Sequence, residues 1–392
     1  MIGDLVISVL LWSLFGLSLV TVGFWLYEQY VGWFKYELPE IKHPPSEVQV
    51  RILTIGDDSN VVQQTVDALP MEVDDVHVIS EQNITIDGAA VNVVPASFSC
   101  EAERKGRALE WGRRNIACDT EYILYLDEDT QAVNFDGLPD ADVVQFGEKP
   151  FETNSKVAYW VEVFRMGFQV EMRAFSMFDV PLYAWGGGIA IRRELEDEIT
   201  WNFKSIVEDT SFVWRSTENR DIEFEYCNDK FRNQAPPSIT ALINQRRRWF
   251  AGSISELDIL PRKYYSIAML RNASWALTIF LPVMISLSWV GLGGYTMSYP
   301  LFYITSSVIL LSVVLSWAAV GCLYMDEPPL FAVVIFALAP GLSLINAVGA
   351  LYGLISPPDS FDVTKKADTT GPTSEVEAPE QTVPTNVEIE SD

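Results

Sequence analysis

Four long runs of uncharged, apolar residues constrain the fold of this chain more than any other feature. They cover residues 5–26, about 273–295, about 301–325 and about 330–355. Each run is long enough to cross a bilayer as a helix, because about 20 apolar residues span the hydrocarbon core. The first run has no basic segment before it and no small-residue cleavage site, so it predicts a retained anchor rather than a signal peptide.

These runs divide the 392 residues into four predicted parts. We expect an N-terminal membrane anchor at 1–30, a soluble domain at 46–260, and an interfacial segment with three membrane helices at 261–356. Residues 360–392 are rich in Thr, Pro, Glu and Asp and poor in large apolar residues. Such a composition predicts a disordered acidic tail.

The charge of the chain excludes one class of partner. There are 53 acidic residues against 27 Lys and Arg, a formal net charge of -26. This charge repels phosphate backbones, so we expect no nucleic-acid partner. The excess of acids and the scarcity of lysine resemble proteins of halophilic archaea. The four cysteines show no CxxC spacing and the two histidines lie in no motif, so neither a zinc site nor histidine catalysis is indicated.

Short apolar segments alternate with helical patterns in the soluble part. Strands are expected at 48–56, 75–80 and 121–126, and helices at 58–69 and 102–116. This alternation predicts an α/β fold with a mostly parallel sheet covered by helices on both sides. Ligands of such sheets bind at the carboxyl ends of the strands.

An acidic triplet follows the third expected strand directly. Extended residues alternate between faces, so Asp127 and Asp129 point one way and Glu128 the other. Two carboxylates on one face suit Mg²⁺ or Mn²⁺, which fill their other positions with phosphate oxygens and water. The alternative is an ordinary solvated acidic turn.

A second acidic pair, Glu208 and Asp209, stands where a helix is expected to begin. A carboxylate there either caps the helix or serves as a general base. The glycine-rich run WGGG at 185–188 leads into a further apolar segment. It forms either a flexible turn before a strand or a place where missing side chains admit a ligand close to the backbone.

The basic run QRRRW at 245–249 precedes the second apolar run. With helical spacing, Gln245, Arg248 and Trp249 share one face. An arginine fork pairs with phosphate oxygens, and a tryptophan ring stacks on a sugar. The alternative is a basic anchor at the membrane surface, in which Arg246 and Arg247 contact lipid headgroups.

Taken together and in this order, these motifs resemble the DxD, [TE]D and QxxRW series of membrane-bound family 2 glycosyltransferases, which include cellulose and hyaluronan synthases. VRILTIG at 50–56, KGRALEW at 105–111, LDEDT at 126–130 and LINQRRRWFAG at 242–252 are most similar to the egghead-type β-1,4-mannosyltransferases. The resemblance covers residues 46–260 and the membrane runs that follow.

The resemblance implies a GT-A fold that binds a GDP- or UDP-sugar, and it assigns a role to each motif residue. Asp209 would be the general base, and Asp129 would hold Mg²⁺ or Mn²⁺. The remaining residues are implied in donor binding (Thr54, Glu81, Lys105 and Asp127), in acceptor binding (Gly187, Gly188, Glu208 and Trp249) and in diphosphate binding (Gln245 and Arg248).

The implied reaction is a single inverting displacement onto a hydroxyl of a lipid-linked or glycolipid acceptor. The enzyme would lie in the cell membrane in contact with its lipids, with its catalytic domain in the cytosol, where nucleotide-sugars are found. Two alternatives stay open at this point: a processive polysaccharide synthase, and a membrane scaffold without turnover.

Overall fold

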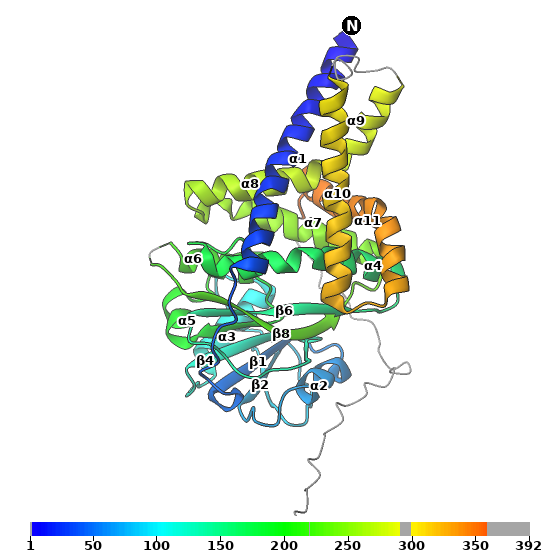
Figure 1. The fold of residues 1–392 in the computed structure, drawn as a ribbon. Helices are drawn as coiled ribbons and strands as arrows, with labels where there is room; N and C mark the ends of the chain where they lie inside the picture. Colours follow the sequence, from blue (N-terminus) through cyan, green and yellow to red (C-terminus); the bar gives the residue numbers. More distant parts are fainter. Residues whose placement is uncertain (1, 219, 291–298, 359–392) are drawn as a thin grey trace, which may run out of the picture.

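The computed structural model describes residues 2–218, 220–290 and 299–358 and shows a sheet domain from which long helices rise (Figure 1). Helix α1 (Ile2–Phe34) leads away from the sheet domain, and α10 (Pro300–Met325) packs beside it. The predicted disordered tail at 360–392 lies outside the described residues, as does the end of the second apolar run.

The sheet of the described part has eight strands in the order β3-β2-β1-β4-β7-β6-β8-β5. The strands are β1 (Val48–Thr54), β2 (Val76–Ser80), β3 (Ala90–Val93), β4 (Tyr122–Asp127), β5 (Gln131–Ala132), β6 (Val143–Phe151), β7 (Ile189–Arg192) and β8 (Phe224–Gln234). β1 pairs in parallel with β2 and β4, while β7 runs antiparallel between β4 and β6. The predicted α/β fold with a mostly parallel sheet is confirmed, and β1, β2 and β4 are the three predicted strands.

Helices cover both faces of this sheet and connect it to the membrane-like part. They are α2 (Ser59–Asp67), α3 (Arg104–Asn115), α4 (Lys156–Arg165), α5 (Arg193–Ile199), α6 (Glu208–Ser216), α7 (Ile239–Ser255) and the 3-10 helices η1 (Pro45–Glu47), η2 (Met166–Met177) and η3 (Leu257–Ile259). α2 and α3 match the two predicted helices to within two residues at each end. α4 and α6 lie between the sheet and the upper helices (Figure 1).

The central strands are buried on both faces, which explains why their sequences are continuously apolar rather than alternating. Every residue of β1 is buried, and in β4 only the last residue, Asp127, is partly exposed. Two separate clusters of buried side chains cover the two faces. The polar end of β4 is therefore held rigidly at the edge of a packed core.

Among the described residues, three helices are long and apolar enough to cross a membrane: α1, α10 and α11 (Pro329–Ile355). A fourth candidate is the pair α8 (Arg262–Leu277) and α9 (Phe280–Trp289), which are bent by 57° at their junction. The second predicted span, at about 273–295, therefore corresponds in the described residues to this bent pair. Pro282 accounts for the break, because it has no N–H for the carbonyl of Thr278 and its ring crowds that turn.

Glycines let α10 and the sheet domain approach closely. A Cβ on Gly321 of α10 would overlap the backbone carbonyl of Val163 in α4, and one on Gly167 of η2 would overlap the carbonyl of Trp317. The backbones of these elements are thus in direct contact. A rigid connection between the membrane-like helices and the sheet domain follows from this packing.

We predict that Gly321→Ala lowers the unfolding free energy of the detergent-solubilised protein by about 1–3 kcal/mol, because the added methyl group forces α10 away from α4. The loss is measured as a lower melting temperature. The matched control is Gly23→Ala in α1, where a Cβ would have no neighbour within 4 Å. An equal melting temperature for the Gly321 variant and the wild type would contradict the close packing described here.

Candidate active site

The carboxyl ends of β1 and β4 face a cavity of about 800 Å³. Asp129, Asp209 and Trp249, which come from distant parts of the sequence, all line this one cavity. Its wall continues upward along residues of α1, α8, α10 and α11. The site predicted at the strand ends therefore connects directly with the space between the membrane-like helices.

A single ammonium group stands among three carboxylates in this cavity. Lys105 of α3 lies 2.8 Å from Asp127, 3.3 Å from Asp209 and 3.9 Å from Glu208. Its Nζ also lies 3.5 Å from the backbone carbonyl of Gly186. Burial by itself would lower the pKa of Lys105, but the three carboxylates outweigh this effect and raise the pKa above its ordinary value. Lys105 is therefore a fixed positive charge in the site.

Asp209 has the properties expected of a base that works near neutral pH. It lies in the first turn of α6, and its side chain is only 17% exposed. Burial raises the pKa of this carboxyl to about 7, the positive charge of Lys105 opposes the shift, and Glu208 and Asp127 add to it. A general base is most effective when its pKa lies near the working pH.

The acidic triplet begins with Asp127, the last residue of β4, and its other two members lie in the turn that follows, where the protein bonds their carboxylates. The carboxylate of Glu128 is buried and accepts a 2.6 Å hydrogen bond from the hydroxyl of Thr54. Asp129 is 2% exposed, and its carboxylate Oδ2 accepts a 2.9 Å hydrogen bond from the backbone N–H of Gln234. Thr54 thus lies at the cavity wall with its hydroxyl engaged by the protein, and its contact with a donor stays a prediction.

Glu81 lies after β2 on the same cavity, where Arg107 of α3 pairs with both of its carboxylate oxygens at 2.8 and 2.9 Å. Gly187 and Gly188 do not contribute to the cavity lining, whereas Gly186 does. A Cβ on Gly187 or Gly188 would lie 2.5 or 2.9 Å from the ring of Trp185, so these glycines make room for a side chain. Their predicted contact with an acceptor stays a prediction.

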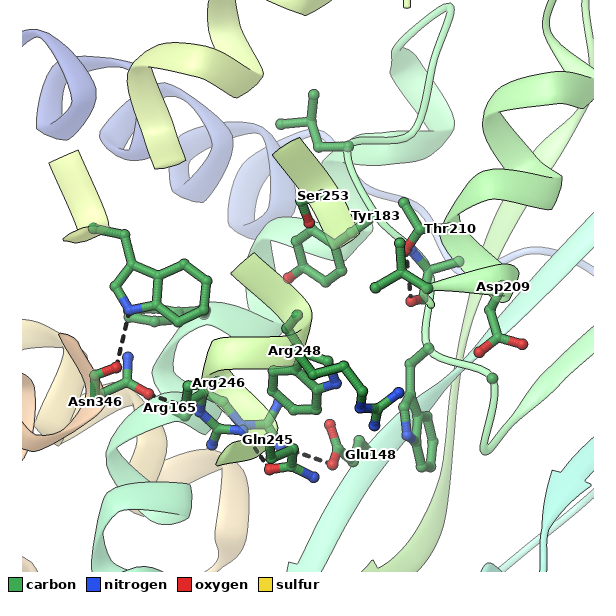
Figure 2. A pocket seen from close by; sticks show the side chains of 18 of the residues that line it. Glu148, Arg165, Tyr183, Asp209, Thr210, Gln245, Arg246, Arg248, Ser253 and Asn346 are labelled. Carbon is green, nitrogen blue, oxygen red and sulfur yellow. Dashed lines mark hydrogen bonds and ion pairs between the residues drawn. The ribbon is translucent and has the colours of Figure 1, made fainter. Parts of the chain in front are cut away.

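The QRRRW run lies within α7, so Gln245, Arg248 and Trp249 share a helix as expected, and all three line the cavity. Figure 2 shows Arg248 extending into the cavity toward the side on which Asp209 lies. Arg248 also donates a 3.3 Å hydrogen bond to the carbonyl of Ile206. This position suits the predicted contact with a diphosphate.

The alternative of a lipid-contacting basic anchor is wrong for Arg246, which is completely buried. Its guanidinium group pairs with Glu162 of α4 and donates 2.9 and 2.6 Å hydrogen bonds to Asn346 of α11 and to Gln245. A charge without water needs such partners, and Glu162 and Asn346 lie too far away in the sequence for the local pattern to indicate them.

Arg247 is only partly buried. It donates a 2.7 Å hydrogen bond to the carbonyl of Ser356, and its guanidinium carbon lies 4.1 Å from the ring centre of Tyr352. A headgroup contact of Arg247 stays a prediction. The ring of Trp249 is held by Arg246 and Arg165, whose guanidinium carbons lie 4.3 and 5.3 Å from its centre. These contacts fix the orientation of the tryptophan.

Several residues of the site have no signal in the sequence. Glu148 of β6 and Arg165 of α4 both line the cavity and form an ion pair of 2.7 Å (Figure 2). Gly186, in contrast, belongs to the conspicuous WGGG run, and a Cβ there would overlap the carboxylate of Asp209. The glycine run is thus part of the site, but the residue in contact with Asp209 is its first glycine.

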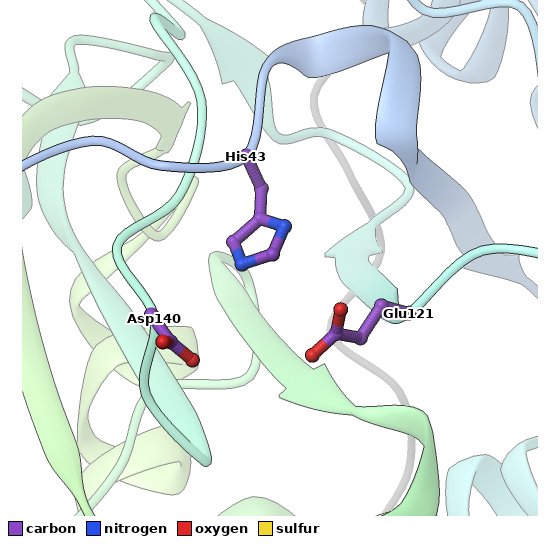
Figure 3. A group of neighbouring side chains, drawn as sticks. All are labelled: His43, Glu121 and Asp140. Atoms are coloured by element: carbon purple, nitrogen blue, oxygen red, sulfur yellow. The ribbon is translucent and has the colours of Figure 1, made fainter.

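A second group of possible metal ligands lies away from this cavity. His43, Glu121 and Asp140 each offer a ligand atom within 4.8 Å of the others (Figure 3). Glu121 directly precedes β4, so the group lies at the opposite end of that strand from Asp127. Arg192 pairs with both Glu121 and Asp140 and offsets one of their two negative charges, and Lys42 lies 3.6 Å from Asp140. The arrangement is that of a surface ion pair rather than of a metal centre.

Comparison with known proteins agrees with this geometry. Residues 122–341 match the model of glycosyl transferase family group 2. No curated protein sequence matches the chain. A mannosyltransferase from Pyrobaculum calidifontis, solved in complex with GDP-mannose and Mn²⁺, superposes with a TM-score of 0.50 and 12% identity over 87% of this chain and 99% of its own.

Two further solved structures overlap less well. Glucosyl-3-phosphoglycerate synthase from Mycobacterium tuberculosis has a TM-score of 0.35 and 15% identity, over 55% of this chain and 81% of its own. Mannosyl-3-phosphoglycerate synthase from Rubrobacter xylanophilus has a TM-score of 0.35 and 14% identity, over 55% of this chain and 76% of its own. At these identities the likenesses concern the fold alone. The family match, however, spans more than half of the 392 residues, and the protein therefore belongs to glycosyl transferase family group 2.

Proposed function

We propose that this protein is a membrane-bound, inverting hexosyltransferase that moves a sugar from a GDP- or UDP-sugar to a hydroxyl of a lipid-linked or glycolipid acceptor. The observation that supports this most strongly is the shared cavity of Asp129, Asp209 and Trp249, which continues between the membrane-like helices. In this proposal residues 46–260 form the cytosolic catalytic domain, and residues 1–30 and 261–356 hold it at the cell membrane.

The donor side of the cavity fits a divalent cation. Asp129 offers hard oxygen ligands in the turn that directly follows β4, and its orientation is fixed by the N–H of Gln234. Mg²⁺ and Mn²⁺ are commonly held by one or two carboxylates together with substrate phosphates, and such an ion neutralises charge on a departing diphosphate. The Pyrobaculum mannosyltransferase, solved with Mn²⁺ and GDP-mannose, supports this choice.

The chain's own residues supply the remaining chemistry. Asp209 removes the proton from the acceptor hydroxyl, whose oxygen forms a bond to the anomeric carbon while the bond from that carbon to the diphosphate breaks on the opposite face. Lys105 and Arg248 provide fixed positive charge for the nucleoside diphosphate that leaves. Asp127, which holds Lys105 at 2.8 Å, orients this charge beside the donor.

The upper part of the cavity suits an acceptor that arrives from the membrane. Trp25 of α1 and Trp317 of α10 line it, and their rings meet edge to face with centres 4.8 Å apart. An acceptor with its lipid part among these helices would place its sugar near Trp249. The resemblance to egghead-type enzymes supports mannose as the transferred sugar, and the acidic composition supports a halophilic archaeal source.

A donor screen tests the proposal. Purified protein is incubated with nucleotide-sugars, including GDP-mannose and UDP-glucose, and with Mg²⁺ or Mn²⁺, in the presence and absence of membrane lipid extract. We expect metal-dependent nucleoside diphosphate release that the lipid extract stimulates, and a product of inverted anomeric configuration by NMR. Release from none of the donors would contradict the proposal, and a long polymeric product would favour a processive synthase instead.

Replacing the proposed base separates donor binding from transfer. Asp209→Asn should reduce the transfer rate by about 10²–10⁴-fold while donor affinity is retained, because the amide cannot accept the proton. Asp179→Asn is the control, since that side chain is 76% exposed and lies outside the cavity lining. Wild-type transfer rates in the Asp209 variant would exclude it as the base.

The charges around Asp209 predict the pH dependence of transfer. Since its pKa is raised to about 7, kcat/KM should fall as the pH drops below about 7 and the carboxylate becomes protonated. We call this fall of kcat/KM at low pH the acid limb of the pH profile. Lys105→Met removes the charge that lowers the pKa of Asp209, so the acid limb should move to higher pH. Glu208→Gln removes a charge that raises it, so the limb should move to lower pH. Shifts of the two variants in the same direction would contradict the assignment.

A further inference from the structure

The turn that carries the glycine run is attached to β6 by a buried side chain as well as by the backbone. Gln145 is fully buried, and its Oε1 accepts a 2.8 Å hydrogen bond from the N–H of Trp185. Its Nε2 donates hydrogen bonds of 3.0 Å to the carbonyl of Trp185 and 2.6 Å to that of Gly188. One side-chain amide thus contacts the backbone at both ends of the turn, and the N–H of Phe146 donates a further 3.0 Å hydrogen bond to the carbonyl of Gly188.

The other side of the same turn is attached to the helix of the proposed base. The hydroxyl of Thr210 accepts a 3.1 Å hydrogen bond from the N–H of Ala184 and lies 3.2 Å from the carbonyl of the same residue. Thr210 follows Asp209 directly in α6. The turn therefore spans two anchors, one in the central sheet and one beside Asp209.

Between these anchors, Gly186 packs directly on the carboxylate of Asp209, so closely that a Cβ would overlap the carboxyl atoms. The backbone of the turn thereby excludes water from one side of this carboxylate and limits its movement. Three charged groups face Asp209: Lys105 of α3, Asp127 of β4 and Glu208 of α6 itself. The hydrogen bonds of Gln145 go to backbone groups instead, so its replacement removes none of these charges.

We propose that Gln145 is a positioning residue for the general base: it holds the 184–188 turn against the carboxylate of Asp209. This inference rests on the proposed function, in which Asp209 takes the acceptor proton. It also explains the glycines of the run, because Gly186 makes room for the carboxylate and Gly187 and Gly188 make room for the ring of Trp185. A misplacement of about 1 Å in such a site can cost about a hundredfold in rate.

The test replaces Gln145 by methionine, which has a similar shape but forms none of the three hydrogen bonds. We expect kcat to fall between about ten- and a hundredfold while the donor KM stays within about twofold of the wild type. Because water gains access to Asp209 when the turn loosens, the acid limb of the pH profile should move to lower pH.

Gln169→Met is the matched control. Gln169 is also a buried glutamine at the cavity wall, but it does not contact the turn. We expect this variant to keep the wild-type acid limb even if its melting temperature falls. The contradicting outcome is that Gln145→Met and Gln169→Met change kcat and melting temperature equally and that neither moves the acid limb. It would show that Gln145 only stabilises the fold, and it would overturn the inference.

Two further measurements keep the inference testable if Gln145→Met folds poorly or if the proposed reaction is wrong. Gly186→Ala alters the same contact from the turn itself and should reproduce the loss of kcat. The titration of Asp209 can also be followed without turnover, as the infrared carboxyl band that disappears in Asp209→Asn. We expect the midpoint of this titration at lower pH in Gln145→Met than in the wild type. An unchanged midpoint would overturn the inference. A shifted midpoint in a protein without transferase activity would contradict only the proposed function.

Discussion

The proposed site depends on one arrangement, in which the ammonium group of Lys105 stands between the carboxylates of Asp127 and Asp209, with Glu208 close by. These groups come from α3, β4 and α6, so the electrostatics of the site arise only when the three elements pack together. Burial and the negative charges of Glu208 and Asp127 raise the pKa of Asp209, and the positive charge of Lys105 opposes the rise. The protonation of the proposed base is therefore set by all four groups.

A second network connects this site with the membrane-like helices. Arg246 joins Glu162 of α4, Asn346 of α11 and the ring of Trp249 in one buried set of contacts. A buried guanidinium group that loses one partner leaves an unpaired charge, so these elements are held in a fixed relation. The tryptophan proposed to meet the acceptor is thus positioned by a helix that is long and apolar enough to cross the membrane.

Much of this architecture could be predicted from the sequence because its signals are local. The continuous apolar strand before Asp127, the acidic pair at the start of a helix and the spacing of Gln245, Arg248 and Trp249 each follow from neighbouring residues. The burial of Arg246 could not be predicted, since its partners are 84 and 100 residues away. The contacts of Gln145 and Gly186 could not be predicted either, because they form only when β6, the glycine turn and α6 come together.

The family match and the fold place this protein among the glycosyltransferases, and the arrangement of charges in the cavity supports a donor site at the end of β4. The most direct measurement is an experimental structure of the protein with GDP and Mn²⁺, in which anomalous scattering locates the metal. We predict one Mn²⁺ ion beside Asp129, with the diphosphate within reach of Lys105 and Arg248. A metal ion found instead at His43, Glu121 and Asp140, or a nucleotide bound outside the cavity, would contradict the proposed site.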